Sequence, residues 1–140
     1  MNRINVIGGT KERRDITEKV VWWYLKKALP RFYTLEINVE LTNCYKKEKA
    51  MGYCVLGDHK KEYEIEVDKN LRLFDFVTTL CHELIHLKQY VRNELVDLNC
   101  RHIKWKGKKF RAHDYDNAPW EKEANKLEVR LAKECFEDVL

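Results

Sequence analysis

The sequence predicts an α+β fold: an N-terminal helix, then a small twisted sheet of about three strands, then two longer helices. Apolar residues recur at helical spacing over residues 16–27, alternate with polar ones in segments of 35–68, and return to helical spacing over 74–93 and 119–139. Strands grouped apart from helices are typical of α+β folds. No repeat or low-complexity linker interrupts the 140 residues, and 44% of them are apolar, so we expect a single domain over 1–140.

The first helix is expected to begin near Asp15, because Asp15 or Thr17 can cap it and apolar residues follow at helical spacing. Pro30 should end it, since proline cannot continue a helix. Three β-type segments are expected next, over 35–41, 51–56 and 62–68.

The segment 62–68 alternates most regularly. Tyr63, Ile65 and Val67 should face one side, and the intervening glutamates the other. As an edge strand near a site, this segment is one candidate for holding an extended peptide by strand addition.

Composition excludes several classes of protein. Lys and Arg number 27 against 23 Asp and Glu, and the pI of about 8.7 lies below the value of about 9 typical of dedicated nucleic-acid domains. The longest apolar run, Val20–Leu25, is too short to span a membrane, and no apolar signal segment opens the chain, so we expect a cytoplasmic protein. Five cysteines without a Cys-x-x-Cys pair are expected to be free thiols.

The motif His82-Glu83-Leu84-Ile85-His86 lies within the second expected helix. At helical spacing the two histidines are about 40° apart on one face, so both imidazoles can bind one Zn²⁺ ion. Glu83 is rotated toward the metal-bound water and is the expected general base.

A catalytic zinc site needs a third protein ligand, and His102, His113, Glu121, Glu123 and Glu128 are the candidates. Glu123 falls within the polar arc of the third helix and is expected to be a solvated surface charge.

Glu121 lies on the apolar arc, where an acid needs a partner or a metal, so it is the favoured ligand. Asn125, one turn on, is expected to support it, and Glu128 is the alternative ligand.

His82-Glu83-x-x-His86 followed by Glu121-x-x-Ala124-Asn125 resembles the gluzincin pattern, as found in short HExxH peptidases of phages and mobile elements. The resemblance covers roughly residues 74–132. It implies a zinc-dependent peptidase with a zincin-like fold, whose active-site helix and C-terminal glutamate helix carry the ligands His82, His86 and Glu121.

The segment around Trp105-Lys106-Gly107-Lys108 and Pro119-Trp120-Glu121 also resembles phage-encoded SprT-like predicted metallopeptidases. In typical SprT-like proteins the third ligand is a histidine, often followed by glycine. Here His102 lacks that glycine and His113 is followed by Asp114, so the chain departs from the pattern.

The expected reaction is hydrolysis of a protein or peptide substrate: zinc polarises the scissile carbonyl and acidifies its water, and Glu83 transfers the proton to the leaving amine. Tyr115 or His113 could donate to the oxyanion, although both also fit ordinary loop residues.

Residues 101–111 carry six basic side chains interleaved with Trp105 and Phe110. They indicate either a weak nucleic-acid contact or a solvated hairpin whose apolar residues pack onto the site helix, and the short run favours the second. Three function hypotheses follow: a zinc metallopeptidase, which leads; a nucleic-acid-associated SprT-like protease with a histidine as third ligand; and a non-catalytic, zinc-stabilised interaction module.

Overall fold

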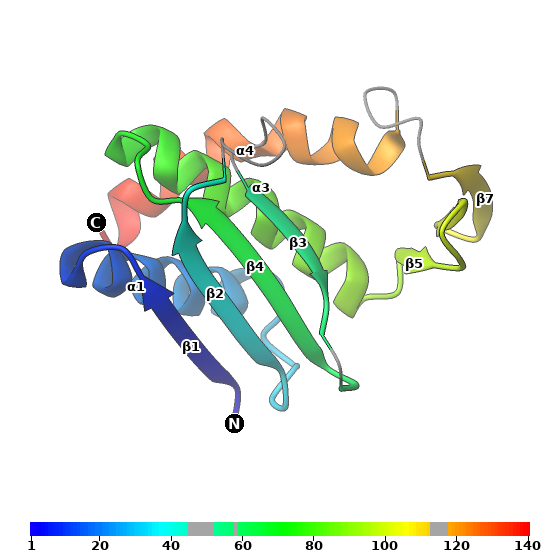
Figure 1. Cartoon of the computed structure of the whole chain (residues 1–140), viewed down its shortest axis with the longest axis horizontal. Helices are drawn as coiled ribbons and strands as arrows, with labels where there is room; N and C mark the ends of the chain where they lie inside the picture. The colour runs from blue at the N-terminus through cyan, green and yellow to red at the C-terminus, as the bar shows by residue number, and fades with distance from the viewer. Residues whose placement is uncertain (45–51, 58, 113–117) are drawn as a thin grey trace.

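A computed structural model describes residues 1–44, 52–57, 59–112 and 118–140 of the chain (Figure 1). Their helices and strands are, in order, β1 (Arg3–Gly8), α1 (Lys11–Ala28), β2 (Glu36–Thr42), β3 (Gly52–Leu56), β4 (Glu62–Asp68), α3 (Leu73–Val91), β5 (Leu95–Asp97), β6 (His102–Trp105), β7 (Lys108–Arg111) and α4 (Pro119–Asp138).

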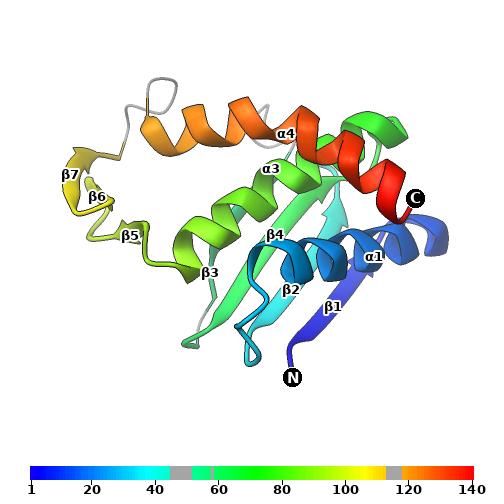
Figure 2. The ribbon, with the colours of Figure 1, turned by 180° about the vertical axis from the view of Figure 1, so that it is seen from behind.

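The larger sheet has four strands in the order β1-β2-β4-β3. β1, β2 and β4 run parallel, and β3 pairs with β4 in the antiparallel sense. The smaller sheet, β5-β6-β7, is antiparallel throughout and follows the end of α3. The two views in Figures 1 and 2 show α1 and α3 against one face of the larger sheet, with α4 lying across α3 as a third layer.

The core lies between the larger sheet and its two covering helices. In β4, Tyr63, Ile65 and Val67 are buried while the glutamates between them are half-buried on the other face, as the alternation predicts. α3 has buried residues all around its circumference, because the sheet, α1 and α4 pack on different sides of it. This enclosed helix carries the HExxH motif.

The α+β class and the three helices are confirmed within the described residues, but the expectation of about three strands is wrong. Two strands were not predicted, β1 and β5. β1 lies at the edge of the sheet, where Ile7 is 61% exposed and only Ile4 and Val6 pack against the core. Two inward-facing apolar residues make too short an alternation to predict a strand. Its parallel pairing to β2 depends on residues more than 30 positions away, which local periodicity does not report.

The expected start of the first helix is also wrong by about one turn. α1 begins at Lys11, and Thr10 is its N-cap, accepting a hydrogen bond from the Arg13 backbone N–H at 3.2 Å. Thr17 is buried inside the helix, where its hydroxyl donates to the Arg13 carbonyl oxygen at 2.7 Å. The helix ends at Ala28, before Pro30, as expected.

The strand 62–68 is not an edge strand, because β4 is paired on both sides, to β2 and to β3. The edge of the sheet on the side of the HExxH helix is β3. The edge strand near the site is therefore β3 and not β4.

The five cysteines are thiols and not disulfides, as expected: Cys100 is exposed, and Cys44, Cys54, Cys81 and Cys135 are buried. In the part of the chain that the structure describes, no helix combines the length and the apolar character needed to cross a bilayer.

Candidate metal centre

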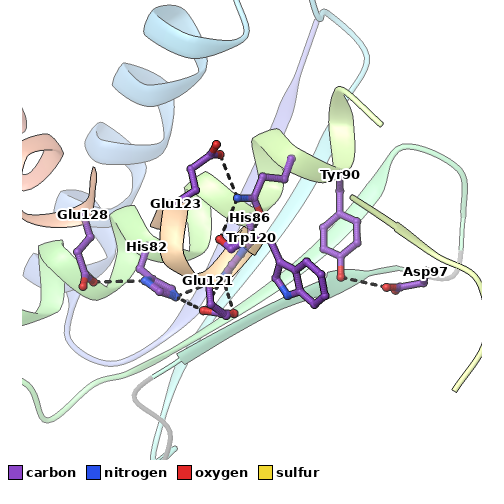
Figure 3. A network of polar contacts seen from close by, with 9 residues as sticks. His82, His86, Tyr90, Asp97, Trp120, Glu121, Glu123 and Glu128 are labelled. Atoms are coloured by element: carbon purple, nitrogen blue, oxygen red, sulfur yellow. Dashed lines mark hydrogen bonds and ion pairs between the residues drawn. The ribbon is translucent and has the colours of Figure 1, made fainter. Parts of the chain in front are cut away.

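His82, His86 and Glu121 come together where the first turn of α4 crosses the middle of α3 (Figure 3). The two Nε2 atoms are 3.2 Å apart. A Glu121 carboxylate oxygen lies 3.0 Å from Nε2 of His82, and the nearer oxygen to Nε2 of His86 is also at 3.0 Å. One ligand atom from each residue therefore faces a common point.

The other ring nitrogen of each histidine is held by a neighbouring side chain. Nδ1 of His82 lies 3.3 Å from a carboxylate oxygen of Glu128, two turns along α4 from Glu121. Nδ1 of His86 lies 2.8 Å from Oε1 of Gln89 on α3. Partners of this kind fix the ring orientation and tautomer of metal-binding histidines.

The orientation of the Gln89 amide settles the tautomer of His86. Nε2 of Gln89 donates to the Trp120 carbonyl oxygen and to a Glu123 carboxylate oxygen, each at 3.1 Å, and neither of these acceptors can donate in return. Oε1 of Gln89 must therefore face His86 and accept from Nδ1–H. Glu128 acts in the same way on His82. Both Nε2 lone pairs are thus left pointing at each other and at the Glu121 carboxylate, which is an arrangement that calls for a cation.

The spacing fits zinc. Two ligands about 2.0–2.1 Å from a tetrahedral ion are about 3.3 Å apart, and the nearest ligand atoms here are 3.0–3.2 Å apart. Two imidazoles with one carboxylate favour zinc and neighbouring first-row metals over magnesium or calcium, which prefer oxygen ligands. His82, His86 and Glu121 could therefore hold a metal ion, and their donor atoms suit zinc or a neighbouring first-row metal.

The ligands open into a cavity of about 150 Å³, which is room for several water molecules. Glu83 lines this cavity although it is only 5% exposed. The backbone of β3 passes close above it, since a Cβ on Gly52 would lie 3.4 Å from Cγ of Glu83 and 2.7 Å from the Glu66 carbonyl oxygen. The remaining lining residues are Cys54, Val55, Tyr90, Leu95, Ile103 and Trp120.

The protonation of the site follows from its burial and its charges. Burial raises the pKa of Glu83 to about 8, with His86 opposing and Glu121 and Glu128 adding to the rise. Burial alone would lower the pKa of each histidine, but the contacts with Glu121, joined by Glu128 at His82 and by Glu83 and Gln89 at His86, together raise both pKa values. Burial would raise the pKa of Glu121, yet the hydrogen bonds from His82 and His86 lower it to about 2. In the metal-free site these contacts favour the protonated histidines, and a metal bound at their Nε2 atoms would displace those protons.

Two expectations about α4 are wrong. Glu123 is not a solvated surface charge: its side chain is 24% exposed and accepts from Gln89, and Lys106 approaches it at 3.9 Å. Asn125 is exposed, and Glu128, one turn beyond it, is the residue that contacts a histidine. Sequence analysis had placed Glu128 on the correct face but only as an alternative ligand.

His102 lies on β6, where its Nδ1 is 3.3 Å from the Asn99 side-chain oxygen, and it is not among the clustered ligands. The candidates His113 and Tyr115 lie outside the described residues. Sequence analysis gave Gln89 no role, although at helical spacing it lies on the same stripe of the helix as the two histidines, three positions after His86.

The β6–β7 hairpin positions Glu121 through the residue before it. Trp120 is buried, and its ring lies 6.3 Å from that of Trp105 and 5.8 Å from that of Phe110. Leu95 and Ala118 complete this second apolar cluster. The apolar residues of the hairpin therefore pack inward, as the solvated-hairpin interpretation expected, and they anchor the first turn of α4 against α3.

Comparisons with protein-family models, with curated proteins and with solved structures find no match. Any functional inference therefore starts from the cluster of His82, His86 and Glu121, whose ligand atoms lie within 4.8 Å of one another.

The zinc-free site predicts how pH acts on stability. Because the pKa values of His82, His86 and Glu83 are raised, the folded chain keeps protons that the unfolded chain releases. The stabilising contribution of Glu83 is lost as pH rises from about 4.5 to about 8, and that of the two histidines is lost as pH rises through their raised pKa values. The contribution of Glu121 is lost only as pH falls from about 4.5 toward 2.

Zinc takes the place of those protons, so its apparent affinity should rise about tenfold per pH unit for each proton displaced. We therefore expect the increase in Tm on adding zinc to be larger at pH 8 than at pH 6, measured by calorimetry with and without chelator. An increase that is equal at both pH values would contradict the proton assignments at His82 and His86.

Proposed function

We propose that this protein is a zinc-dependent peptidase. The observation that carries the proposal is the convergence of two Nε2 lone pairs and a carboxylate on one point, with both Nδ1 atoms held by acceptors. A cavity next to that point contains a buried glutamate, Glu83, that is not itself among the clustered ligands. A three-ligand site open to a water-sized cavity is typical of catalytic rather than structural zinc.

The residues divide the work between them. His82, His86 and Glu121 would hold the ion, which when bound supplies a Lewis acid for the scissile carbonyl and its water. Glu83 would accept the proton from the attacking water and return it to the leaving amine. Its raised pKa in the zinc-free site shows how strongly burial disfavours its charge, and the ion's positive charge would bring that pKa down toward the range of a working base.

The edge strand β3 offers the place for the substrate backbone. It lines the cavity through Gly52, Cys54 and Val55, and among described strands it pairs only with β4. A peptide extended along its free edge would lie over the ligands.

The test is cleavage of an unstructured protein such as casein, and of a mixed peptide library, by the zinc-loaded chain. Cleavage that chelation stops and added zinc restores would support the proposal. A protein that binds one zinc per chain, loses its fold on chelation and cleaves nothing would instead be a zinc-stabilised interaction module.

A second candidate function, contact with duplex nucleic acid, is favoured by the register of the hairpin. Lys104 lies directly opposite Lys109, and His102 opposite Arg111, so one face of the hairpin is basic throughout. Like charges opposite each other cost stability, and a phosphate backbone would offset that cost. Because Trp105 and Phe110 pack on Trp120, base stacking is not part of this candidate.

We expect Lys104→Glu with Lys109→Glu to weaken binding of a mixed-sequence duplex and to reduce the slope of log K against log salt by about two. Fluorescence anisotropy at several salt concentrations measures both. The control pair is Lys122→Glu with Lys126→Glu, exposed on α4. If the control pair weakens binding equally, the hairpin is not the contact; no binding by the wild type ends this candidate.

A further inference from the structure

We propose that a second cavity, beside the metal centre, binds a large apolar side chain of the substrate, with aromatic side chains preferred. The inference rests on the proposed peptidase function and names the substrate class. The cavity has a volume of about 340 Å³, more than twice that of the metal cavity. It is bordered by the end of β3, the start of β4, the end of α3 and β5.

The two cavities form one path along β3. They share Tyr90 and Leu95 as lining residues, and Tyr90 stands beside Trp120 in Figure 3. Cys54 of β3 lines the metal cavity, and Leu56, two residues on, lines the second cavity. Residues two apart on a strand face the same side and are about 7 Å apart. A peptide paired with the edge of β3 would therefore place side chains two positions apart over the two cavities.

The inner surface of the second cavity is apolar and aromatic. Tyr63 and Leu95 are buried, and Tyr90 and Val96 are half-buried at its sides. An aromatic side chain seated among two tyrosines gains ring contacts beyond the burial of its area. Such contacts favour Phe or Tyr over Leu, and any of these over Ala.

The charges of the cavity do not select a charged ligand. Lys60 and Lys61 line the cavity together with Glu62 and Asp97, so both signs are present. Asp97 accepts a hydrogen bond from the Tyr90 hydroxyl at 3.4 Å, which ties its carboxylate to the wall. The selectivity of the second cavity is therefore expected to come from its shape and its apolar surface.

The experiment compares the zinc-loaded wild type with Val96→Trp, which fills the second cavity from its side. A peptide library read by mass spectrometry gives kcat/KM for peptides with Phe, Leu or Ala at each position near the scissile bond. The wild type should prefer Phe over Ala about tenfold at one position of the peptide. That position should lie two residues away from one of the two residues that form the scissile bond. Val96→Trp should abolish that preference while changing kcat/KM for the Ala peptide less than twofold. Leu98→Trp, exposed just after β5 and outside the cavity, is the matched control and should keep the preference.

Failure of the inference and failure of the proposed function give different results. A wild type that cleaves peptides with no aromatic preference, or a preference that survives in Val96→Trp, overturns the inference alone. If no peptide is cleaved, anisotropy of labelled Phe and Ala peptides on the same zinc-loaded proteins decides: tighter binding of the Phe peptide, lost in Val96→Trp, supports the cavity, and equal binding overturns it.

Discussion

Replacing Glu121 by alanine is expected to reduce zinc content from one ion per chain to less than a tenth of that. Glu121 supplies the only carboxylate oxygen within the described ligand cluster, and that carboxylate lies 3.0 Å from Nε2 of each histidine. Without it, two imidazoles remain, whereas catalytic zinc sites use three protein ligands and structural zinc sites use four. Elemental analysis of protein purified without chelators measures the loss.

Two control variants make this result specific. Glu134→Ala removes a carboxylate from the same helix, where it pairs with Lys27 away from the site, and should leave zinc content unchanged. His113→Ala tests the alternative third ligand of the SprT-like resemblance. Zinc retained in Glu121→Ala and lost in His113→Ala would contradict the two-histidine, one-glutamate centre and replace it with a three-histidine one.

The parts of this molecule that sequence could predict are those set by neighbours within one helix. His82 and His86 share a face because a helix turns about 100° per residue, whatever surrounds it. The same rule singled out Glu121, since it lies on the apolar arc of α4 with Ala124 and Leu131, which are buried. Both steps needed only the period of a helix and the cost of burying an acid.

Sequence analysis was wrong about the exposure of residues that are covered by more than one neighbouring element. Glu123 belongs to the polar arc of α4, yet the first turn of that helix is enclosed by α3 on one side and by the β6–β7 hairpin on the other. Gln89 and Lys106 therefore reach a residue that a single apolar face would leave in water. The hairpin itself was expected, but its packing on Trp120 depends on tertiary contacts that periodicity does not encode.

The strand β1 was missed for a related reason. Parallel strands are joined by a crossover, here through α1, so the partner of Ile4 and Val6 lies far along the chain. Because β2 and β3 flank β4, the strand 62–68 is internal, and the edge near the site is β3. The surface proposed for the substrate thus depends on the strand order, which the alternation of 62–68 alone did not determine.

Replacing Glu83 by glutamine is expected to lower kcat about 10²- to 10⁴-fold, the range of general acid–base catalysis, while zinc content stays at one per chain. The amide keeps the size of the side chain under β3 but cannot accept a proton from water. Glu83 is absent from the clustered ligands, so the ion loses no described donor. Peptide cleavage with elemental analysis of the same preparations measures both quantities.

The same variant separates chemistry from folding. Glu83 is buried, and its raised pKa means that its charge is disfavoured in the folded zinc-free chain, so a neutral amide should not destabilise that chain. The increase in Tm on adding zinc should likewise match that of the wild type. Activity equal to wild type would remove Glu83 from the reaction, and loss of zinc would assign it to the metal. Lost turnover with a full complement of zinc and an unchanged Tm would leave proton transfer as the role of Glu83.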